Sequence, residues 1–176
     1  MRHRRDWLVL LALVACGNHD TSTTKQDHAA PVKPAAPPPR PLDTLQMEVP
    51  AGWQATYDKA SDAWLFTTPP LADGQTTTAR IDRADPHMVA SPDAYLHSRR
   101  ERWPAGTTAD FEKRESVKGG FAMTVSVKPA ADPTHPRRET YVVRELGSVY
   151  YECISEAVPD DATRDQLVAL CKSLKL

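Results

Sequence analysis

Two small groups of polar residues in the middle of the chain have side chains that could do chemistry. Asp82 and Asp85 are close enough in sequence to act as a general acid and a general base. Asp85, His87 and His97 carry side chains that can bind zinc. Neither spacing matches a recurrent site, and a polar strand end followed by solvated histidines explains both groups more simply. We therefore expect no catalytic residue, no metal and no cofactor.

The composition of the chain and the absence of certain motifs exclude several further classes of function. The chain has 176 residues, and its 22 Lys+Arg and 23 Asp+Glu give a formal charge of −1, unlike the strongly basic surface of a nucleic-acid-binding protein. A hydrophobic content of 40% is enough to form a core. Gly147-Ser148 lacks the frame of a GxSxG nucleophile elbow, and the glycines are scattered among turns rather than gathered in a phosphate-binding loop. We expect no nucleic-acid partner.

Two segments could bind a partner without chemistry. Arg99, Arg100 and Arg102 with Trp103 could hold an anionic glycan or an acidic strip of another protein, although a solvated helix face with the aromatic ring packed inward is the simpler interpretation. The loop 129–138, with three prolines followed by two arginines, is a second possible contact with a partner, because rigid loops on a scaffold often carry recognition.

The N-terminus has the features of an export signal. Arg2, Arg4 and Arg5 precede an unbroken apolar run over residues 7–14. This run of 8 residues is much shorter than the roughly 20 that a membrane-spanning helix needs, and it fits the apolar region of a secretory signal. An ordinary buried strand or helix explains neither the terminal position nor the arginines.

The end of this leader resembles a bacterial lipobox. The residues Leu13-Val14-Ala15-Cys16 match the sequence that prolipoprotein-processing enzymes recognise. The resemblance implies that residues 1–15 are a signal peptide, that cleavage follows Ala15, and that the thiol of Cys16 carries diacylglycerol. A plain secretory signal with a coincidental cysteine is the alternative.

Lipidation would place the protein on a membrane of the cell envelope. One acyl chain holds a protein only marginally, but the two or three chains of a bacterial lipoprotein, palmitate among them, should hold it stably. In a Gram-negative cell the domain would lie on the periplasmic side of the inner or the outer membrane. Gly17 stands where the inner-membrane retention signal of some bacteria has aspartate, which favours the outer membrane.

Residues 16–44 are predicted to be a lipidated N-terminus followed by a disordered linker. Six of the sixteen prolines lie between residues 31 and 41, and no apolar residue recurs with the period of a helix or a strand. A flexible chain of this length spans roughly 30 Å, and the prolines lengthen it. A proline-rich docking motif is the alternative.

Residues 45–176 have the size and pattern of one α+β domain. We predict an antiparallel sheet of six to eight strands, with alternating apolar residues at 45–49, 53–57, 63–68, 76–83, 111–117, 121–127, 138–145 and 148–156. Helices are predicted at 92–103, after the N-cap Ser91, and at 161–174, after Asp160 or Asp161.

The hairpin 138–156 indicates how the helices lie. Both of its faces are apolar: Val142, Val149, Tyr151 and Cys153 share one, and Tyr141, Val143, Tyr150 and Ile154 share the other. A sheet that is apolar on both faces needs a cover on each. With one helix on each side, the fold would be an α/β/α sandwich.

Cys153 and Cys171 lie on inward faces of the last predicted strand and the last predicted helix. An exported chain meets oxidising conditions, which favours a disulfide between them over two separate buried thiols. No CxxC or HxxxH spacing accompanies the cysteines, so a metal site is not indicated.

Two short motifs resemble the PsbP/Mog-like domain. These are Val49-Pro50-Ala51-Gly52-Trp53 at the start of the domain and Cys171-Lys172-Ser173-Leu174 at its end. The group, an α/β/α sandwich, includes the photosystem II extrinsic subunit family, the Mog nuclear-import family and several bacterial lipoproteins. The resemblance covers residues 45–176 and implies a binding or accessory module more often than an enzyme.

These inferences together predict a membrane-anchored envelope lipoprotein whose domain is a non-catalytic module that binds an envelope protein. Two alternatives stay open. A lipoprotein hydrolase acting on envelope material would show a cleft with a histidine or paired carboxylates of perturbed pKa. A structural or assembly lipoprotein would show a large exposed apolar patch.

Overall fold

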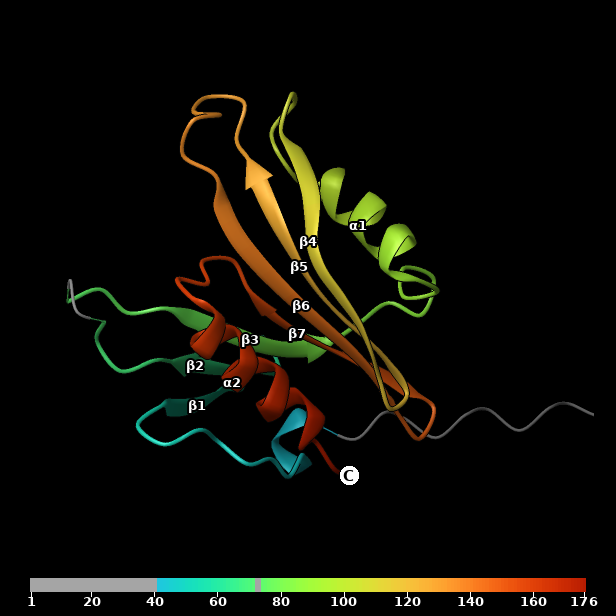
Figure 1. Cartoon of the computed structure of the whole chain (residues 1–176). Coiled ribbons are helices and arrows are strands. Elements are labelled where there is room, and N and C mark those ends of the chain that lie inside the picture. Colours follow the sequence, from blue (N-terminus) through green and yellow to red (C-terminus); the bar gives the residue numbers. More distant parts are fainter. Residues whose placement is uncertain (1–40, 72–73) are drawn as a thin grey trace, which may run out of the picture. The chain divides into compact units, whose positions relative to one another are not determined.

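Alternating apolar and polar residues form the strands of one antiparallel sheet in the described part of the chain (Figure 1). The strands are β1 (Gln54–Asp58), β2 (Ala63–Thr67), β3 (Thr78–Arg83), β4 (Thr108–Val117), β5 (Gly120–Lys128), β6 (Arg137–Leu146) and β7 (Val149–Ser155). Their order across the sheet is β1-β2-β3-β7-β6-β5-β4. The helices are α1 (Pro92–Arg100) and α2 (Asp161–Lys172), with a short 3-10 helix η1 (Leu42–Thr44) before β1.

The computed structural model describes residues 41–71 and 74–176. The predicted signal peptide (1–15), its cleavage after Ala15, the lipidation of Cys16 and the linker as far as residue 40 lie outside the described residues. Within them, the seven antiparallel strands and two α-helices confirm the predicted α+β fold.

Glycines make the two tight hairpins possible. Gly119 has a φ of +76° in the turn between β4 and β5, a conformation that side chains with a Cβ rarely adopt. A Cβ on Gly120 would lie 2.0 Å from the carbonyl oxygen of Val143 on the adjacent β6. Gly147, with a φ of +68°, turns the chain from β6 into β7. Both predicted hairpins are confirmed.

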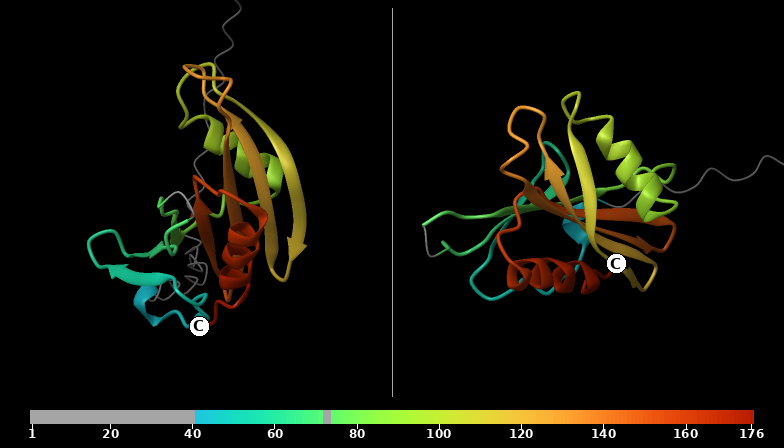
Figure 2. Two further views of the ribbon diagram at one scale, coloured as in Figure 1. Left: turned by 60° about the vertical axis from the view of Figure 1, so that its left-hand side comes forward. Right: turned by 45° about the horizontal axis from the view of Figure 1, so that its top comes forward.

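The two helices cover opposite faces of the sheet, as the right-hand view of Figure 2 shows. Helix α1 begins at Ser91, whose Oγ accepts from the backbone N–H of Ala94 at 3.1 Å. Helix α2 begins at Asp160, whose carboxylate accepts from the backbone N–H of Thr163 at 2.7 Å. Each cap satisfies a backbone donor that the helix itself leaves unpaired.

A separate apolar core lies under each helix, and the two faces of the β6–β7 hairpin divide between these cores as predicted. Val142, Tyr151 and Cys153 belong to the core under α2, and Val149 packs against it. Tyr141, Val143 and Ile154 belong to the core under α1, and Tyr150 packs against that one. Because the sheet is covered on both faces, the fold is an α/β/α sandwich.

Several predicted boundaries are wrong, among them the start of β4, which lies at Thr108 rather than at residue 111. Residues 45–49 form no strand, since Gln46 makes only an isolated bridge to Lys175. Helix α1 ends at Arg100 rather than at residue 103, because the residue that precedes Pro104 is disfavoured in helical conformation. Helix α2 ends at Lys172 rather than at residue 174, because the chain must extend to form the bridge at Lys175.

A disulfide and an arginine hold the end of α2 to the sheet. Cys153 of β7 and Cys171 of α2 are joined, with their Cα atoms 6.3 Å apart and both side chains buried. The guanidinium of Arg144 on β6 donates to the carbonyl oxygens of Cys171, at 2.9 Å, and Lys172, at 2.5 Å. The last carbonyls of a helix lack the amide partners that inner carbonyls have, and the arginine supplies donors to them.

Asp62, in the turn between β1 and β2, ties the start of the domain to the sheet. Its Oδ1 accepts from the backbone N–H of Leu42 at 2.9 Å and from the hydroxyl of Tyr57 at 2.5 Å, and its Oδ2 accepts from Arg83. The hydrogen bond from Tyr57, supported by the bonds from Leu42 and Arg83, lowers the pKa of Asp62 from 3.8 to about 2.

Acidification should remove the stability that Asp62 contributes. Because the pKa is lower in the folded chain than in the unfolded chain, this contribution is present above pH 4 and disappears as the pH falls through 2. The side chain is 33% exposed, so we expect a loss of about 1–2 kcal/mol. Urea unfolding at pH 5 and pH 2.5 measures it. Between these pH values, Asp62→Asn should lose less free energy of unfolding than the wild type loses. The control Glu48→Gln, at an exposed site, should lose as much as the wild type. Equal losses in all three proteins would contradict this role of Asp62.

Candidate functional site

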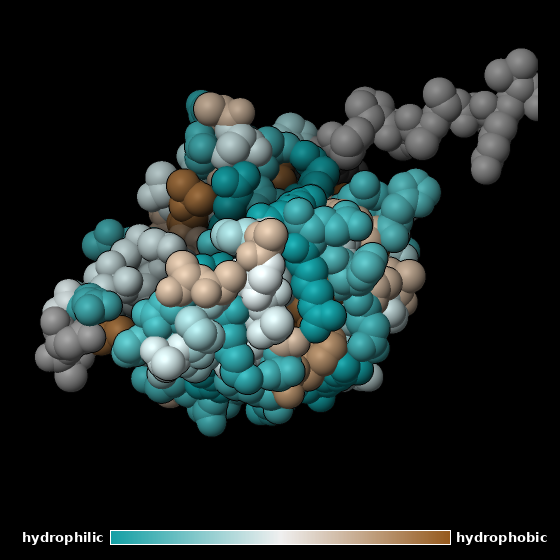
Figure 3. Space-filling model, turned by 90° about the horizontal axis from the view of Figure 1, so that it is seen from above, coloured by the Kyte–Doolittle hydropathy of each residue, from teal (hydrophilic) through white to brown (hydrophobic). Residues whose placement is uncertain are grey.

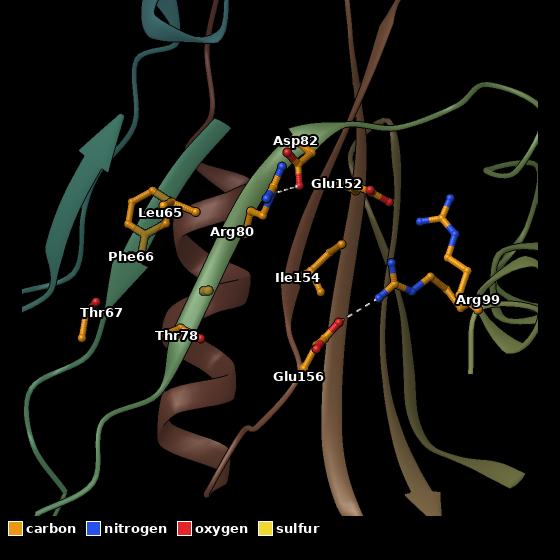
Figure 4. A pocket seen from close by; sticks show the side chains of 12 residues that line it. Leu65, Phe66, Thr67, Thr78, Arg80, Asp82, Arg99, Glu152, Ile154 and Glu156 are labelled. Carbon is orange, nitrogen blue, oxygen red and sulfur yellow. Dashed lines mark hydrogen bonds and ion pairs between the residues drawn. The ribbon is translucent and has the colours of Figure 1, made fainter. Parts of the chain in front are cut away.

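An open groove of about 630 Å³ lies on the face of the sheet that α1 covers only in part. Its volume is in the range of small-ligand sites. Helix α1 packs on β5 and covers the β4–β6 end of this face, while β2 and β3 extend beyond it. The groove runs over β2, β3 and β7, with the end of α1 as one wall (Figure 4).

Both apolar and charged side chains line the groove. Leu65 on β2 and Ile154 on β7 form apolar parts of the floor, and Leu65 is 39% exposed. The charged lining residues in the described chain are three arginines and three carboxylates: Arg80, Arg99, Arg102, Asp82, Glu152 and Glu156. The formal charges of the lining therefore cancel.

On β3, Arg80 and Asp82 form an ion pair inside the groove. Because residues two apart in a strand share a face, both side chains stand over the sheet on the side of α1. The Nε of Arg80 donates to Oδ2 of Asp82 at 2.5 Å, as the dashed line in Figure 4 marks. The carboxylate of Asp82 thus has a strong cationic partner from its own strand.

Glu152 on β7 lies directly opposite Asp82 in the register of the sheet. It is only 7% exposed, and its Oε2 accepts from the hydroxyl of Tyr95 on α1 at 2.5 Å. Burial raises the pKa of Glu152, and the hydrogen bond from Tyr95 opposes this effect without cancelling it. The groove therefore holds two facing carboxyl groups, and one of them, Glu152, has a raised pKa.

Arg99 reaches the groove from α1. Its side chain is 10% exposed, and its guanidinium carbon lies 5.1 Å from the centre of the Tyr141 ring, within the range of a cation–π contact. One terminal nitrogen donates to Glu156 at 3.1 Å (Figure 4), while Nε has no hydrogen-bond partner among the described residues. The Glu156 side chain is 64% exposed and is therefore a partner that a ligand could displace.

The residues of the predicted basic cluster have different roles: some stabilise the fold, and others line the groove. Arg99 is buried, which the solvated-face interpretation did not expect, and Arg100 donates to the carbonyl oxygen of Ala109 at 2.8 Å. Arg102 is exposed in the groove and forms no salt bridge with any residue that the structure describes. Its side chain contacts the sulfur of Met88 at 3.8 Å. Trp103 packs against the core under α1, as predicted.

The zinc candidates from the sequence do not come together, whereas Asp82 and Asp85 both line a smaller depression beside the groove. Asp85 accepts there from the backbone N–H of His87 at 2.9 Å. His97 lies on α1, and its Nε2 is 3.8 Å from Oε1 of Glu101. Within residues 41–71 and 74–176, no three His, Cys, Asp or Glu side chains are grouped so that they could hold a metal ion.

The two arginines that follow the proline-rich loop serve the fold. Arg137 pairs with the fully buried Glu139 at 2.6 Å. Arg138 pairs with Glu112 on β4 at 2.7 Å and with Asp161 at the start of α2 at 2.8 Å. The loop itself is exposed, and its Asp132 accepts from the hydroxyl of Thr134 at 2.8 Å. Both guanidinium groups thus have partners within the domain.

A smaller depression of about 420 Å³ continues the groove past the ends of the strands. It shares Arg80, Asp82, Arg102 and Glu152 with the first. The two cavities therefore adjoin and share a charged lining. Glu152 and Glu156 were not among the residues chosen from the sequence, because nothing near them in the chain marks them as facing Asp82 or Arg99.

Comparisons with known proteins identify no family for this chain. No protein-family model matches the chain, and no curated protein matches its sequence. Part of the chain is similar in structure to LpqN, described as involved in cell envelope biogenesis of Mycobacterium tuberculosis, with a TM-score of 0.43, 14% identity, and coverage of 75% of this chain and 82% of that one. At this level the likeness says nothing about function. None of the helices in the described residues is long and apolar enough to cross a membrane.

Proposed function

We propose that this protein is a lipid-anchored component of a bacterial cell envelope, and that its folded domain is a non-catalytic binding module. Acyl chains on Cys16 would hold the N-terminus in a membrane. Residues 17–40 would connect the lipid to the domain, which includes the predicted linker residues 42–44 as helix η1, and the groove beside α1 would bind another envelope component. The domain would then act by recognition at a membrane surface outside the cytosol.

The order of residues at the N-terminus carries the proposal. Three arginines, an apolar run of 8 residues and the sequence LVAC follow one another at the spacing of a lipoprotein leader. The disulfide between Cys153 and Cys171 supports export, because such bonds persist in oxidising compartments and are rare in the cytosol.

The geometry of the domain supports a place among the PsbP-like sandwiches. The two motifs that carry this resemblance contribute to one core, which contains Trp53 of the first and Cys171 and Leu174 of the second. Trp53 also donates from its indole nitrogen to Oε1 of Gln166 on α2 at 3.0 Å. Cys171 of the second closes the disulfide to β7. A binding role agrees with the groove, whose carboxylates Asp82 and Glu152 are held by donors of the domain itself.

An assembly role through apolar contacts has less support. On the face that Figure 3 shows, hydrophilic residues cover most of the surface and apolar residues form small separate patches. The large hydrophobic residues that are exposed in the described chain are Val49, Leu65 and Leu176, at 39%, 39% and 52%.

Replacing the acylated thiol should release the protein from the membrane. In cells fed radiolabelled palmitate, the wild type should carry the label and sediment with membranes, whereas Cys16→Ala should lose the label and keep its leader. The loss should be nearly complete, because the thiol is the acceptor of the diacylglyceryl group. Gel mobility and fractionation measure both effects.

The double variant Cys153→Ala/Cys171→Ala is the matched control, because it removes two thiols and keeps Cys16. It should take up label as the wild type does. Label or normal processing in Cys16→Ala would contradict the proposal.

A lipoprotein hydrolase is the second candidate, and one observation favours it. Asp82 and Glu152 face each other in an open groove, and burial raises the pKa of Glu152, as in sites where one carboxyl donates a proton and the other acts as a base. Incubating the purified protein with envelope oligosaccharides and measuring the product masses tests it. Cleavage that Glu152→Gln abolishes would replace the binding module with an enzyme.

A further inference from the structure

The groove beside α1 carries an inference about its ligand. Its lining places guanidinium groups, carboxylates and apolar carbon atoms within one surface: Arg99 and Arg102 on the wall, Asp82 and Glu152 on the floor, and Leu65 and Ile154 beside them. A ligand that fits must offer hydroxyl or amide donors to the carboxylates, an acceptor to the arginines and carbon-bound hydrogens to the floor.

We propose that the groove binds a saccharide that carries a carboxylate, with its anionic group on Arg99 and Arg102 and its hydroxyls on Asp82 and Glu152. This rests on the proposed function, since it names the ligand class of the same binding module. Both uronic acids and ether-linked muramic acids have this chemistry.

The acids of the groove argue against an acidic peptide or a nucleic acid. Asp82, Glu152 and Glu156 lie among the arginines, so a ligand with a dense row of negative charges would meet repulsion along the floor. A sugar instead presents several hydroxyls, which donate to carboxylates, for each anionic group that it carries.

The arginines argue against a neutral sugar. Arg80 is paired with Asp82, but Arg102 forms no salt bridge within the described residues, and the ion-pair partner of Arg99 among them is the exposed Glu156. A hydrogen bond between two ionised groups is roughly twice as strong as one between neutral groups, so a carboxylate that pairs with these guanidinium groups gains more than a hydroxyl would. The exposed Glu156 is the group that it would displace.

The apolar part of the groove floor offers a surface on which a sugar ring can pack. Leu65 stands 39% exposed at one side of the groove, whereas Ile154 lies at its base and is 8% exposed (Figure 4). The carbon-bound hydrogens of a pyranose ring can pack on such a surface while the hydroxyls at its rim reach the charged residues. With the adjoining depression, the groove has room for more than one ring.

Calorimetric titration of the full-length processed protein in detergent tests the proposal. The ligands are digalacturonate, the disaccharide of N-acetylglucosamine and N-acetylmuramate, neutral galactobiose, and a tetraglutamate peptide. We expect at least one of the two acidic sugars to bind at least tenfold more tightly than both galactobiose and the peptide, and the one that binds identifies the source of the carboxylate. No binding by either acidic sugar, equal binding of galactobiose, or binding of the peptide alone would overturn the proposal.

Arg102→Gln locates the site. Because this side chain is exposed and outside both cores, the variant should unfold at the same temperature as the wild type and bind the acidic sugar at least tenfold more weakly. Arg114→Gln, which removes an exposed arginine paired with Asp93 outside the groove, should bind within twofold of the wild type. Unchanged affinity in Arg102→Gln would overturn the assignment. Failure of these titrations leaves the labelling of Cys16 unaffected, so the two proposals fail separately.

Discussion

Reduction of the Cys153–Cys171 disulfide is expected to lower the free energy of unfolding by about 3 kcal/mol. The bond closes a loop with a sequence separation of 18, and opening it restores chain entropy mainly to the unfolded state. It also frees the end of α2 from β7. For a domain of this size, the loss corresponds to a fall in Tm of roughly 10 °C. Thermal unfolding with and without dithiothreitol measures it.

The double variant Cys153→Ala/Cys171→Ala separates the bond from other effects of the reductant. It should unfold near the temperature of the reduced wild type, with a further small loss because both side chains are buried. Its Tm should not respond to dithiothreitol. A wild type whose Tm is the same in both conditions, after complete reduction is verified by mass, would show that the bond does not stabilise the domain.

Removing the charge of Arg137 is expected to damage the core, although this side chain is 44% exposed. Its Nε donates at 2.6 Å to Glu139, which is fully buried and also accepts from the hydroxyl of Tyr141. In Arg137→Met the carboxylate would stay buried without its cation. Breaking a buried pair from one side costs about 3 kcal/mol, and we expect a loss of this size in urea unfolding.

Two further variants show whether the buried carboxylate is the cause. Arg137→Met/Glu139→Gln should recover most of the lost stability, because the amide can still accept from Tyr141 and carries no charge. Lys128→Met removes a cation of the same 44% exposure, but its partner Asp110 is 68% exposed, so the loss should stay below about 1 kcal/mol. Equal losses in Arg137→Met and Lys128→Met would refute the argument.

The elements that could be predicted are those whose signals are local. Ser91-Pro92 and Asp160 mark the helix starts because a cap needs only its own side chain and the next turn. The alternation of residues 121–127 predicts β5, and Phe121, Met123, Val125 and Val127 all face the core under α1. The pairing of two cysteines followed from the same reasoning about inward faces, and the structure joins them.

The burial of Arg164 could not be predicted, because two of the groups that it contacts are distant in sequence. Arg164 is 2% exposed on α2, a position at which the pattern of charges suggests solvent. Its Nε donates to Thr124, 40 residues earlier, at 3.2 Å, and its Nη2 lies 3.2 Å from Oε2 of Glu115. Only the order of strands in the sheet, which no local pattern contains, brings these groups together.

The groove could not be predicted either, because its residues also come from distant parts of the chain. β3 pairs with β7 across some 70 positions of the chain, and this pairing places Asp82 opposite Glu152. The carboxylate pair considered from the sequence, Asp82 with Asp85, reflected neighbouring positions along the chain. The pair that forms across the sheet depends on topology.

The mass of the N-terminal peptide of the membrane-extracted protein tests the central claim most directly. Proteolysis and mass spectrometry should give a peptide that begins at Cys16 and carries a diacylglyceryl group on sulfur. A peptide that begins at Met1, or one that begins elsewhere and carries no fatty acid, would contradict the account and remove the basis for placing the domain at a membrane.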